Sequence, residues 1–188
     1  IASPIAKILD NIVTDSFSYH VKQFIVNEQH GFLKGRSTET NLFVFTDFIV
    51  NNLELGKEVD CIFTDMKKAF DRVDITLLLV KLSELGIGNP LLNWLSSFLN
   101  DRKQVVVIKE VKSCNINVTS GVPQGSHLGP VLFSLFINDV INVVKHSNIL
   151  LFADDIKIFR LISSTGDCSY LQSDLDRFYN WCINNKIE

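Results

Sequence analysis

The stretch ILLFADDIKIF at residues 149–159 decides the fold that this sequence predicts. Apolar residues on both sides of Ala153, Asp154 and Asp155 predict two short strands joined by a tight turn. Strand pairing fixes the direction of such a turn, so a hairpin can present adjacent carboxylates at one edge of a sheet. Charged groups among apolar strand residues are unfavourable unless a partner compensates them. The hairpin is therefore the starting point for interpreting the rest of the chain.

A third carboxylate follows another apolar stretch. Residues 59–64 predict a short strand, and Asp65 comes directly after it. Oxygen ligands suit magnesium, and phosphoryl-transfer sites hold two such ions about 3.5–4 Å apart. Asp65, Asp154 and Asp155 are therefore candidate metal ligands and catalytic residues. Each has an ordinary alternative when taken alone, because adjacent Asp residues are common in turns and Asp65 could be a helix N-cap.

Between these carboxylates lies a glycine-rich segment, SGVPQGSHLGP at residues 120–130. Gly121, Gly125 and Gly129 would allow the backbone to approach a flat ligand closely. Gln124 offers both a hydrogen-bond donor and an acceptor. Composition alone would favour a plain connector, so the segment gains meaning only together with the three carboxylates.

The remaining pattern predicts an α+β fold in one domain, with helices packed on a small antiparallel sheet. Apolar spacing predicts helices, and alternation between turn signals predicts strands. The expected elements are a helical stretch over residues 3–26, a helix capped by Ser37 and continuing to Leu53 before Gly56, a helix over 77–85 ending at Gly86, a short helix after Pro90, strands at 103–108 and 115–119 joined by a charged turn, a buried helix over 131–144, and a final amphipathic helix through Leu171, Leu175, Phe178 and Trp181.

The chain has 188 residues and a net charge of −3, which argues mildly against a nucleic-acid binder. Such proteins normally use Lys and Arg to replace the counterions of phosphates. Carboxylates concentrated at a metal site, or a basic partner domain elsewhere, would reconcile the charge with nucleic-acid binding.

The four cysteines form no CxxC pair, so neither a zinc site nor a disulfide framework is expected. No stretch has transmembrane length without polar interruption, and the N-terminus lacks the form of a signal peptide. An intracellular protein without a membrane partner is expected. Both ends look cut, because the chain does not begin with Met and stops inside a predicted element.

At the motifs themselves the sequence resembles a known family. DCIFTDMKKAFDRVD (60–74), SGVPQGSHLGPVLFSLFINDV (120–140) and LLFADDIKIF (150–159) resemble three successive palm motifs of reverse transcriptases, in the same order. QHGFLKGRSTETNL (29–42) is similar to the segment just upstream in enzymes of non-LTR retrotransposons of the jockey and LINE type. PIAKILDNIV (4–13) is similar to the end of the preceding fingers segment. The resemblance covers essentially the whole chain.

This resemblance implies a right-hand polymerase fold in which residues 1–188 form a partial reverse transcriptase domain. Residues 1–58 would belong to the fingers and residues 59–188 mainly to the palm. The thumb would be missing, together with the endonuclease domain that is common in these elements.

The resemblance also implies roles for single residues. Asp65 and Asp154 would bind metal, with Asp155 as the second carboxylate of the hairpin. Phe70 would exclude the 2′-hydroxyl of a ribonucleotide by steric conflict.

Two further pairs of residues are expected near nucleic acid or nucleotide. The resemblance implies that Gln124 and Gly125 contact the incoming nucleotide and the template. Lys34 and Arg36 would contact a phosphate backbone or simply form a solvated basic loop.

The implied cofactors are two Mg²⁺ ions, or Mn²⁺ in their place. The implied partners are an RNA template, a DNA primer and dNTPs, together with the missing thumb and endonuclease domains. Nuclear residence follows only from how such elements integrate, since the sequence shows no import signal.

Several alternatives stay open at this point. One is a catalytically inactive, truncated remnant of such an element, and another is a group II intron-type maturase. A viral RNA-dependent RNA polymerase is disfavoured by Phe70, because RNA synthesis needs room for the 2′-hydroxyl. The plainest alternative is a structural domain with an Asp-Asp turn.

Overall fold

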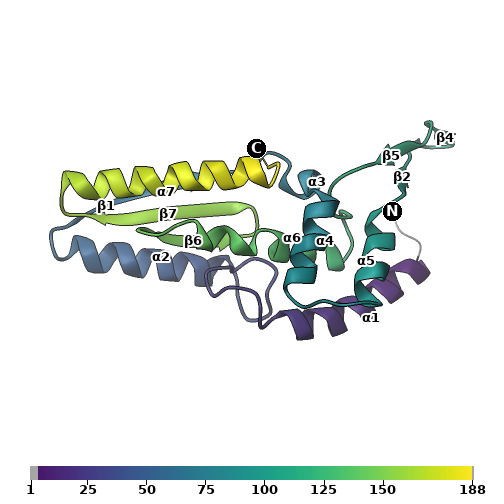
Figure 1. Ribbon diagram of the computed structural model, residues 1–188, viewed down its shortest axis with the longest axis horizontal. Coiled ribbons are helices and arrows are strands. Elements are labelled where there is room, and N and C mark those ends of the chain that lie inside the picture. Colours follow the sequence, from purple (N-terminus) through teal and green to yellow (C-terminus); the bar gives the residue numbers. More distant parts are fainter. Residues whose placement is uncertain (1–3, 188) are drawn as a thin grey trace.

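A small antiparallel sheet between two long helices dominates the computed structural model, which describes residues 4–187 and the side chains of residues 7–187 (Figure 1). The elements in chain order are α1 (Pro4–Val21), α2 (Thr38–Leu53), β1 (Glu58–Thr64), α3 (Ala69–Arg72), α4 (Ile75–Glu84), α5 (Leu91–Leu99), β2 (Arg102–Gln104), β3 (Val107–Ile108), β4 (Val111–Lys112), β5 (Ile116–Val118), α6 (Leu128–Phe136), the 3₁₀ helix η1 (Asn138–Asn142), β6 (Asn148–Phe152), β7 (Asp155–Ile162) and α7 (Thr165–Asn184). The predicted α+β class is confirmed.

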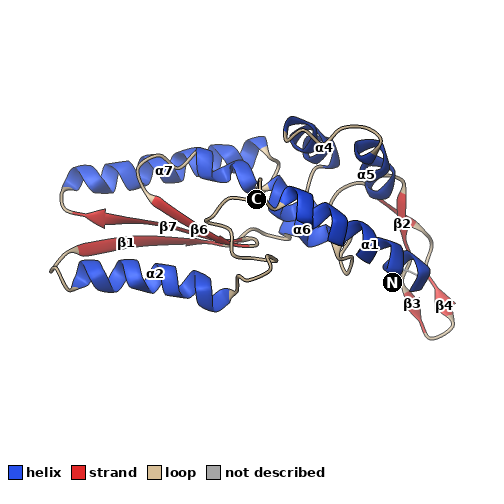
Figure 2. Cartoon of the chain, turned by 90° about the horizontal axis from the view of Figure 1, so that it is seen from below, coloured by secondary structure: helices blue, strands red, loops and turns tan. Residues whose placement is uncertain are grey.

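The central strand of the sheet is β7, which pairs antiparallel with β1 on one side and β6 on the other. Helices α2 and α7 cover opposite faces of the sheet (Figure 2). Alternation along β7 matches this arrangement, since neighbouring side chains of a strand point to opposite faces. Ile158 belongs to the main core with α7, whereas Phe159 packs its ring edge-on against Phe45 of α2, with ring centroids 5.2 Å apart.

A second group of helices, α1, α4, α5 and α6, continues the core beyond one end of the sheet (Figure 1). Helix α6 is buried almost throughout, and Phe133 and Phe136 are fully enclosed. Within residues 4–187, no helix is both long enough and apolar enough to cross a membrane.

Local sequence signals fix several element ends at the expected positions. Ser37 caps α2 in a capping box with Thr40, and the helix ends at Leu53 as predicted. The hairpin of β6 and β7, the short helix after Pro90 and the final amphipathic helix are likewise confirmed.

Two predicted helices are longer than the helices that form, and Asn138 is involved at the point of difference in both. The helix predicted over 3–26 ends at Val21, and residue 3 lies outside the described part of the chain. The Asn138 side chain accepts from Val26 N–H and donates to the Phe24 carbonyl, so this segment leaves the helical path. Asn138 is also where the helix predicted over 131–144 divides into α6 and η1.

The two strands predicted at 103–108 and 115–119 are instead split into two short ladders. β2 pairs with β5 and β3 pairs with β4, and the expected charged turn joins the latter pair. The single ladder predicted between these two strands is interrupted at Ser113, because the Ser113 hydroxyl accepts a hydrogen bond from Val106 N–H. We call residues 102–118 the arm. It projects from the body (Figure 1), and the apolar side chains of Ile108 and Val111 within it are exposed.

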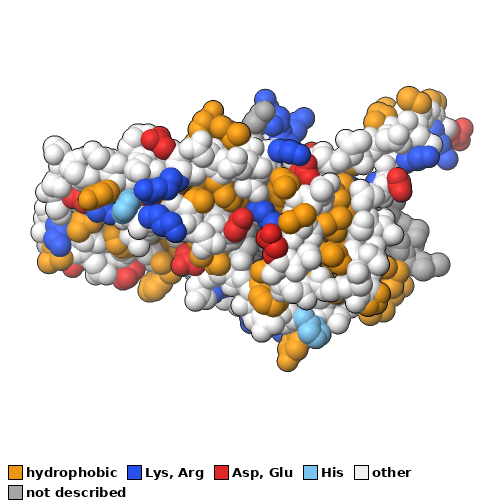
Figure 3. Space-filling model, viewed as in Figure 1, with side chains coloured by type: hydrophobic (Ala, Val, Ile, Leu, Met, Phe, Trp, Pro, Cys, Tyr) orange, Lys and Arg blue, Asp and Glu red, His pale blue; other side chains and the backbone are white. Residues whose placement is uncertain are grey.

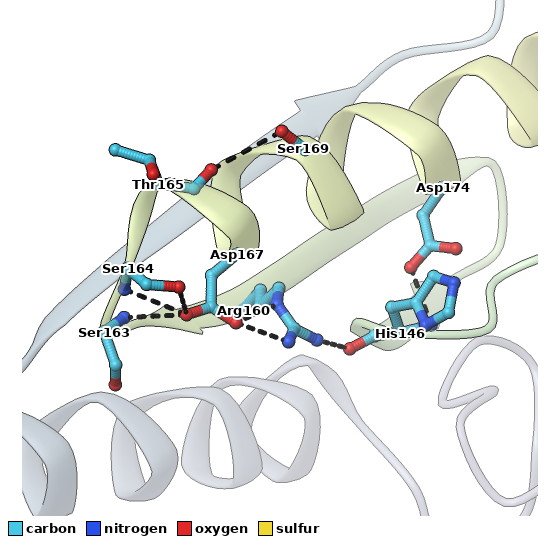
Figure 4. Close-up of polar contacts among 8 residues, drawn as sticks. All are labelled: His146, Arg160, Ser163, Ser164, Thr165, Asp167, Ser169 and Asp174. Carbon is cyan, nitrogen blue, oxygen red and sulfur yellow. Dashed lines mark hydrogen bonds and ion pairs between the residues drawn. The ribbon is translucent and has the colours of Figure 1, made fainter.

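At the far end of the sheet, Asp167 joins β7 to the start of α7 (Figure 4). Its Oδ1 lies 2.6 Å from Nη2 of Arg160 on β7. Its Oδ2 accepts from the N–H groups of Ser163 and Ser164 at 3.1 and 3.0 Å. The hydrogen bond from Arg160, followed by those from Ser164 and Ser163, lowers the pKa of Asp167 to about 2.

Asp167→Asn is expected to lower stability at neutral pH and to remove part of its pH dependence. A carboxylate whose pKa is lower in the folded state stabilises the fold above its unfolded pKa, about 3.9, and that contribution is lost as pH falls towards 2. The difference between the two proteins should therefore be constant above pH 5 and shrink below pH 4. Urea unfolding midpoints measured from pH 7 to pH 2.5 would check this, and parallel curves would contradict it.

Candidate active site

The three acidic candidates meet at one edge of the sheet. Phe152 pairs with Asp155, so the turn of the hairpin consists of Ala153 and Asp154. In the other ladder Thr64 pairs with Ile156, and the register extended by one step places Asp65 opposite Asp155. Asp154, in the turn, therefore lies at the same edge as the other two carboxylates.

The pKa of Asp154 reflects both its burial and the two neighbouring carboxylates. Burial raises the pKa of Asp154, and the negative charges of Asp155 and Asp65 raise it further. Within the described part of the chain, no three acidic, His or Cys side chains form a ready-made metal cage. Charge coupling acts over longer distances than ligation does, so both findings hold together. The oxygen-only donor set fits magnesium, because an added cation would relieve the mutual repulsion.

Acidic side chains appear near the middle of one face of the molecule, where the sheet meets the second group of helices (Figure 3). Lys and Arg side chains lie next to them and in further groups on either side (Figure 3). The net charge of −3 is therefore unevenly distributed. Carboxylates gather near the middle of this face, and Lys and Arg side chains lie around them (Figure 3).

A buried glutamine holds the turn that carries Asp154. The Gln29 side chain is 1 % exposed, and its Oε1 accepts from Ala153 N–H at 3.0 Å and from Gly31 N–H at 2.7 Å. The segment around Gln29 pairs with the outer edge of β6, where His30 N–H donates to the Leu151 carbonyl at 2.9 Å. This segment therefore fixes the position of the hairpin from outside the sheet.

Gly31 permits this contact because it has no side chain. A Cβ atom built on Gly31 would lie 2.4 Å from the backbone nitrogen of Ala153 and 3.1 Å from Gln29 Oε1. Ala153 itself has a φ of +54°, a left-handed conformation that is uncommon outside glycine. The turn is therefore held in an unfavourable conformation by close packing against the segment beside it.

The glycine-rich segment packs on the chain that follows Asp65. Gly121 N–H donates to the Val73 carbonyl at 2.8 Å, and Val122 N–H donates to the Phe70 carbonyl at 2.9 Å. Gly121 has a φ of +80°, and a Cβ there would lie 2.7 Å from Cα of Asp71. The two motifs thus form one packed unit, which needs glycine at this position.

Gln124 extends the same contact through side chains. Its Nε2 donates to Oδ1 of Asp71 at 2.8 Å. Both residues line an open cleft of about 700 Å³, together with Arg102 and Lys103 of the arm. Gly125 has a φ of +81°, and a Cβ atom placed on it would meet no other atom within 4 Å, so its surroundings are open.

With this geometry established, similarity to known proteins identifies the family. The protein-family description "Reverse transcriptase (RNA-dependent DNA polymerase)" matches residues 1–188. The chain belongs to the reverse transcriptase family. It is 31% identical to the probable RNA-directed DNA polymerase from transposon BS of Drosophila melanogaster, over 95% of this chain and 20% of the relative. It is 32% identical to the RNA-directed DNA polymerase from mobile element jockey of Drosophila funebris, over 94% of this chain and 20% of the relative.

Solved structures show the same fold at low sequence identity. The apo telomerase of Candida tropicalis, truncated from its C-terminal domain, aligns with a TM-score of 0.63 and 13% identity, over 89% of this chain and 36% of that one. Telomerase from Candida albicans in complex with a fragment of telomeric RNA aligns with a TM-score of 0.61 and 14% identity, over 92% of this chain and 32% of that one.

The chain is therefore a reverse transcriptase domain of the non-LTR retrotransposon kind, in agreement with the sequence prediction. It spans about a fifth of the length of the curated relatives that it matches.

Within this reverse transcriptase domain, the other predicted site residues lie in two places. Phe70 is half-buried and stacks on Phe133, with ring centroids 4.3 Å apart and an interplanar angle of 19°. Lys34 is exposed, whereas Arg36 donates to the backbone carbonyls of Asn27 and Gln29. Of the two basic candidates, Arg36 thus helps to hold the segment that supports the hairpin, and Lys34 is open to solvent.

Sequence reasoning missed Gln29, Gly31 and Asn41 as parts of the site. Asn41 Nδ2 donates to the Leu151 carbonyl at 3.1 Å, and its Oδ1 accepts from Lys157 Nζ at 2.6 Å. A signal was present for Gly31, because a glycine beside polar residues can indicate close backbone approach. Which backbone approaches it depends on tertiary contacts more than a hundred residues apart.

Proposed function

We propose that this domain carries out template-directed DNA synthesis on RNA. The 3′-hydroxyl of a DNA primer attacks the α-phosphorus of a dNTP, a new phosphodiester bond forms, and pyrophosphate leaves. The observation that carries the proposal is the meeting of Asp65, Asp154 and Asp155 at one sheet edge, where burial and the two neighbouring charges raise the pKa of Asp154.

The residues present fit the divalent ions that this chemistry requires. Asp65, Asp154 and Asp155 would hold Mg²⁺, or Mn²⁺ in its place, because all three offer carboxylate oxygens. Two bound ions would neutralise charge on the triphosphate and favour the ionised form of the primer hydroxyl. The protein's own contribution is positioning, since Gln29 and Gly31 fix the hairpin before any substrate arrives.

We assign sugar selection and template contact to the packed unit that the glycine-rich segment forms with the chain after Asp65. Phe70 would lie under the sugar and exclude a 2′-hydroxyl, supported from behind by Phe133. The loop of Gln124 and Gly125 would contact the incoming nucleotide and the template, since its open surroundings leave room for both. Lys34 would contact a phosphate backbone.

The parts that grip the primer and template would come from the rest of the parent protein. We propose a division into a fingers portion, residues 1–58, and a palm, residues 59–188. A thumb and an endonuclease domain would complete the parent protein. The protein would act in the nucleus, where the target DNA lies.

Primer extension by the full-length protein that carries this chain tests the proposal. An RNA template, a DNA primer, dNTPs and magnesium should give extended DNA, and chelation of magnesium should stop the reaction. NTPs should be used poorly in the same assay. Equal use of NTPs would favour an RNA polymerase, and absence of any extension would favour a catalytically inactive remnant.

A further inference from the structure

The ring of Phe70 is held from two sides by aromatic rings of different character. Phe133 stacks on one face, and it is fully buried within α6. Phe32 meets Phe70 edge-on, with ring centroids 5.8 Å apart and an interplanar angle of 85°. Such edge-to-face pairs are a favourable aromatic geometry. Phe133 therefore supports the Phe70 ring from the buried core, whereas Phe32 contacts the same ring from a loop.

Neither burial nor backbone preference accounts for the position of Phe32. Its side chain is 52 % exposed, and its φ of +59° places it in the left-handed region, where aromatic residues are rarely found. Unfavourable backbone conformations of this kind persist where the surrounding structure enforces them, and they gather at functional sites. The contact that Phe32 gains in this conformation is the one with Phe70.

Phe32 is also tied to the carboxylate hairpin through its neighbours in the chain. Gly31 packs directly against the backbone of Ala153, and Gln29 binds both residues through its Oε1. The ring of Phe32 is therefore placed relative to the turn of Asp154 by the short segment that begins at Gln29. One short segment thus contacts both the turn that carries Asp154 and the proposed sugar-excluding ring.

We propose that Phe32 is a positioning residue for sugar selection, which keeps the Phe70 ring in the orientation that excludes a 2′-hydroxyl. The proposal rests on the proposed function and adds a residue to it. With Phe32 shortened, the Phe70 ring gains space on its open side and can tilt away from Phe133. The tilt makes room for the additional oxygen of a ribonucleotide.

A different role for Phe32 would give a different result. Its side chain also borders a cavity of about 350 Å³, together with Tyr19, Lys22 and Lys34. A residue that only contacted a template strand there would affect dNTP and NTP incorporation to the same extent. The ratio of the two activities therefore separates positioning of Phe70 from contact with the template.

The test is single-nucleotide incorporation by the full-length protein, measured as kcat/KM for a dNTP and for the matching NTP. Phe32→Ala should lower the dNTP/NTP ratio about tenfold, chiefly through better use of the NTP, as expected for loss of one aromatic pair. Phe32→Tyr should keep the ratio, and Phe32→Leu, which retains apolar bulk, should give an intermediate value. Phe43→Ala, which removes an exposed ring from α2, is the matched control and should leave the ratio unchanged.

A double-variant cycle adds a second measurement. Phe70→Ala should lower the ratio further than Phe32→Ala, and adding Phe32→Ala to it should cause no further loss, because both act through one ring. An unchanged ratio in Phe32→Ala and Phe32→Leu, or equal losses for both nucleotides, would overturn this inference and leave the proposed function standing. Absence of incorporation by the unaltered protein would overturn the proposed function and this inference with it.

Discussion

Asp154→Asn is expected to reduce DNA synthesis by the full-length protein about a thousandfold or more, because it removes a proposed ligand of the catalytic ions. The fold should remain intact. Burial and the charges of Asp155 and Asp65 raise the pKa of Asp154, so its charged form is disfavoured in the folded protein. A neutral amide of the same size removes this repulsion, and the unfolding midpoint at neutral pH should not fall.

The measurement is primer extension on an RNA template, paired with urea unfolding of the same preparations. Asp47→Asn is a suitable control, since it neutralises an exposed carboxylate on α2 that is not among the proposed ligands. The control should retain activity. Near-normal synthesis by Asp154→Asn would show that the carboxylates at this sheet edge do not carry the reaction.

Gly31→Ala is expected to have the second-largest effect, through the position of the hairpin rather than its chemistry. The added Cβ would lie 2.4 Å from Ala153 N, whereas ordinary contacts begin at 3.4 Å, so the two segments must separate by roughly 1 Å. A displacement of this size at a reacting centre lowers rates about a hundredfold. Overpacking of this kind should also cost about 2 kcal/mol of unfolding free energy.

Gly88→Ala provides the matched control, because no atom lies within 4 Å of a Cβ placed there and its φ is not in the left-handed region. It should leave both activity and the urea midpoint close to those of the unaltered protein. Equal behaviour of the two variants in both assays would mean that Gly31 does not set the hairpin position.

The parts of this fold that the sequence predicts well are those decided within a few residues. Ser37 caps α2 through contacts with Thr40, three residues away, and the hairpin around Asp154 follows from the apolar residues on both sides of it. Asp65 is predicted beside the hairpin because it ends a strand of the same small sheet. The pairing of β1 with β7 brings it there, although its role as a ligand stays a prediction.

The errors occur where distant residues compete for the backbone. Apolar spacing continues beyond Val21, but the side chain of Asn138, more than a hundred positions away, forms hydrogen bonds with the backbone of Phe24 and Val26. Gln29 is missed for the same reason, since its partner Ala153 lies 124 residues later. A polar side chain in a sequence gives no indication of whether it faces water or a buried backbone group.

The register of β7 also bears on how this protein can change during evolution. Side chains alternate along a strand, so inserting or deleting one residue in β7 would turn every following side chain to the opposite face. An insertion directly after Asp155, the first residue of β7, would therefore turn Ile156 and Ile158 out of the core. The turn between β3 and β4 has no such constraint, because its neighbours pair only with each other. Descendants can therefore gain or lose residues at the tip of the arm while β7 keeps its length.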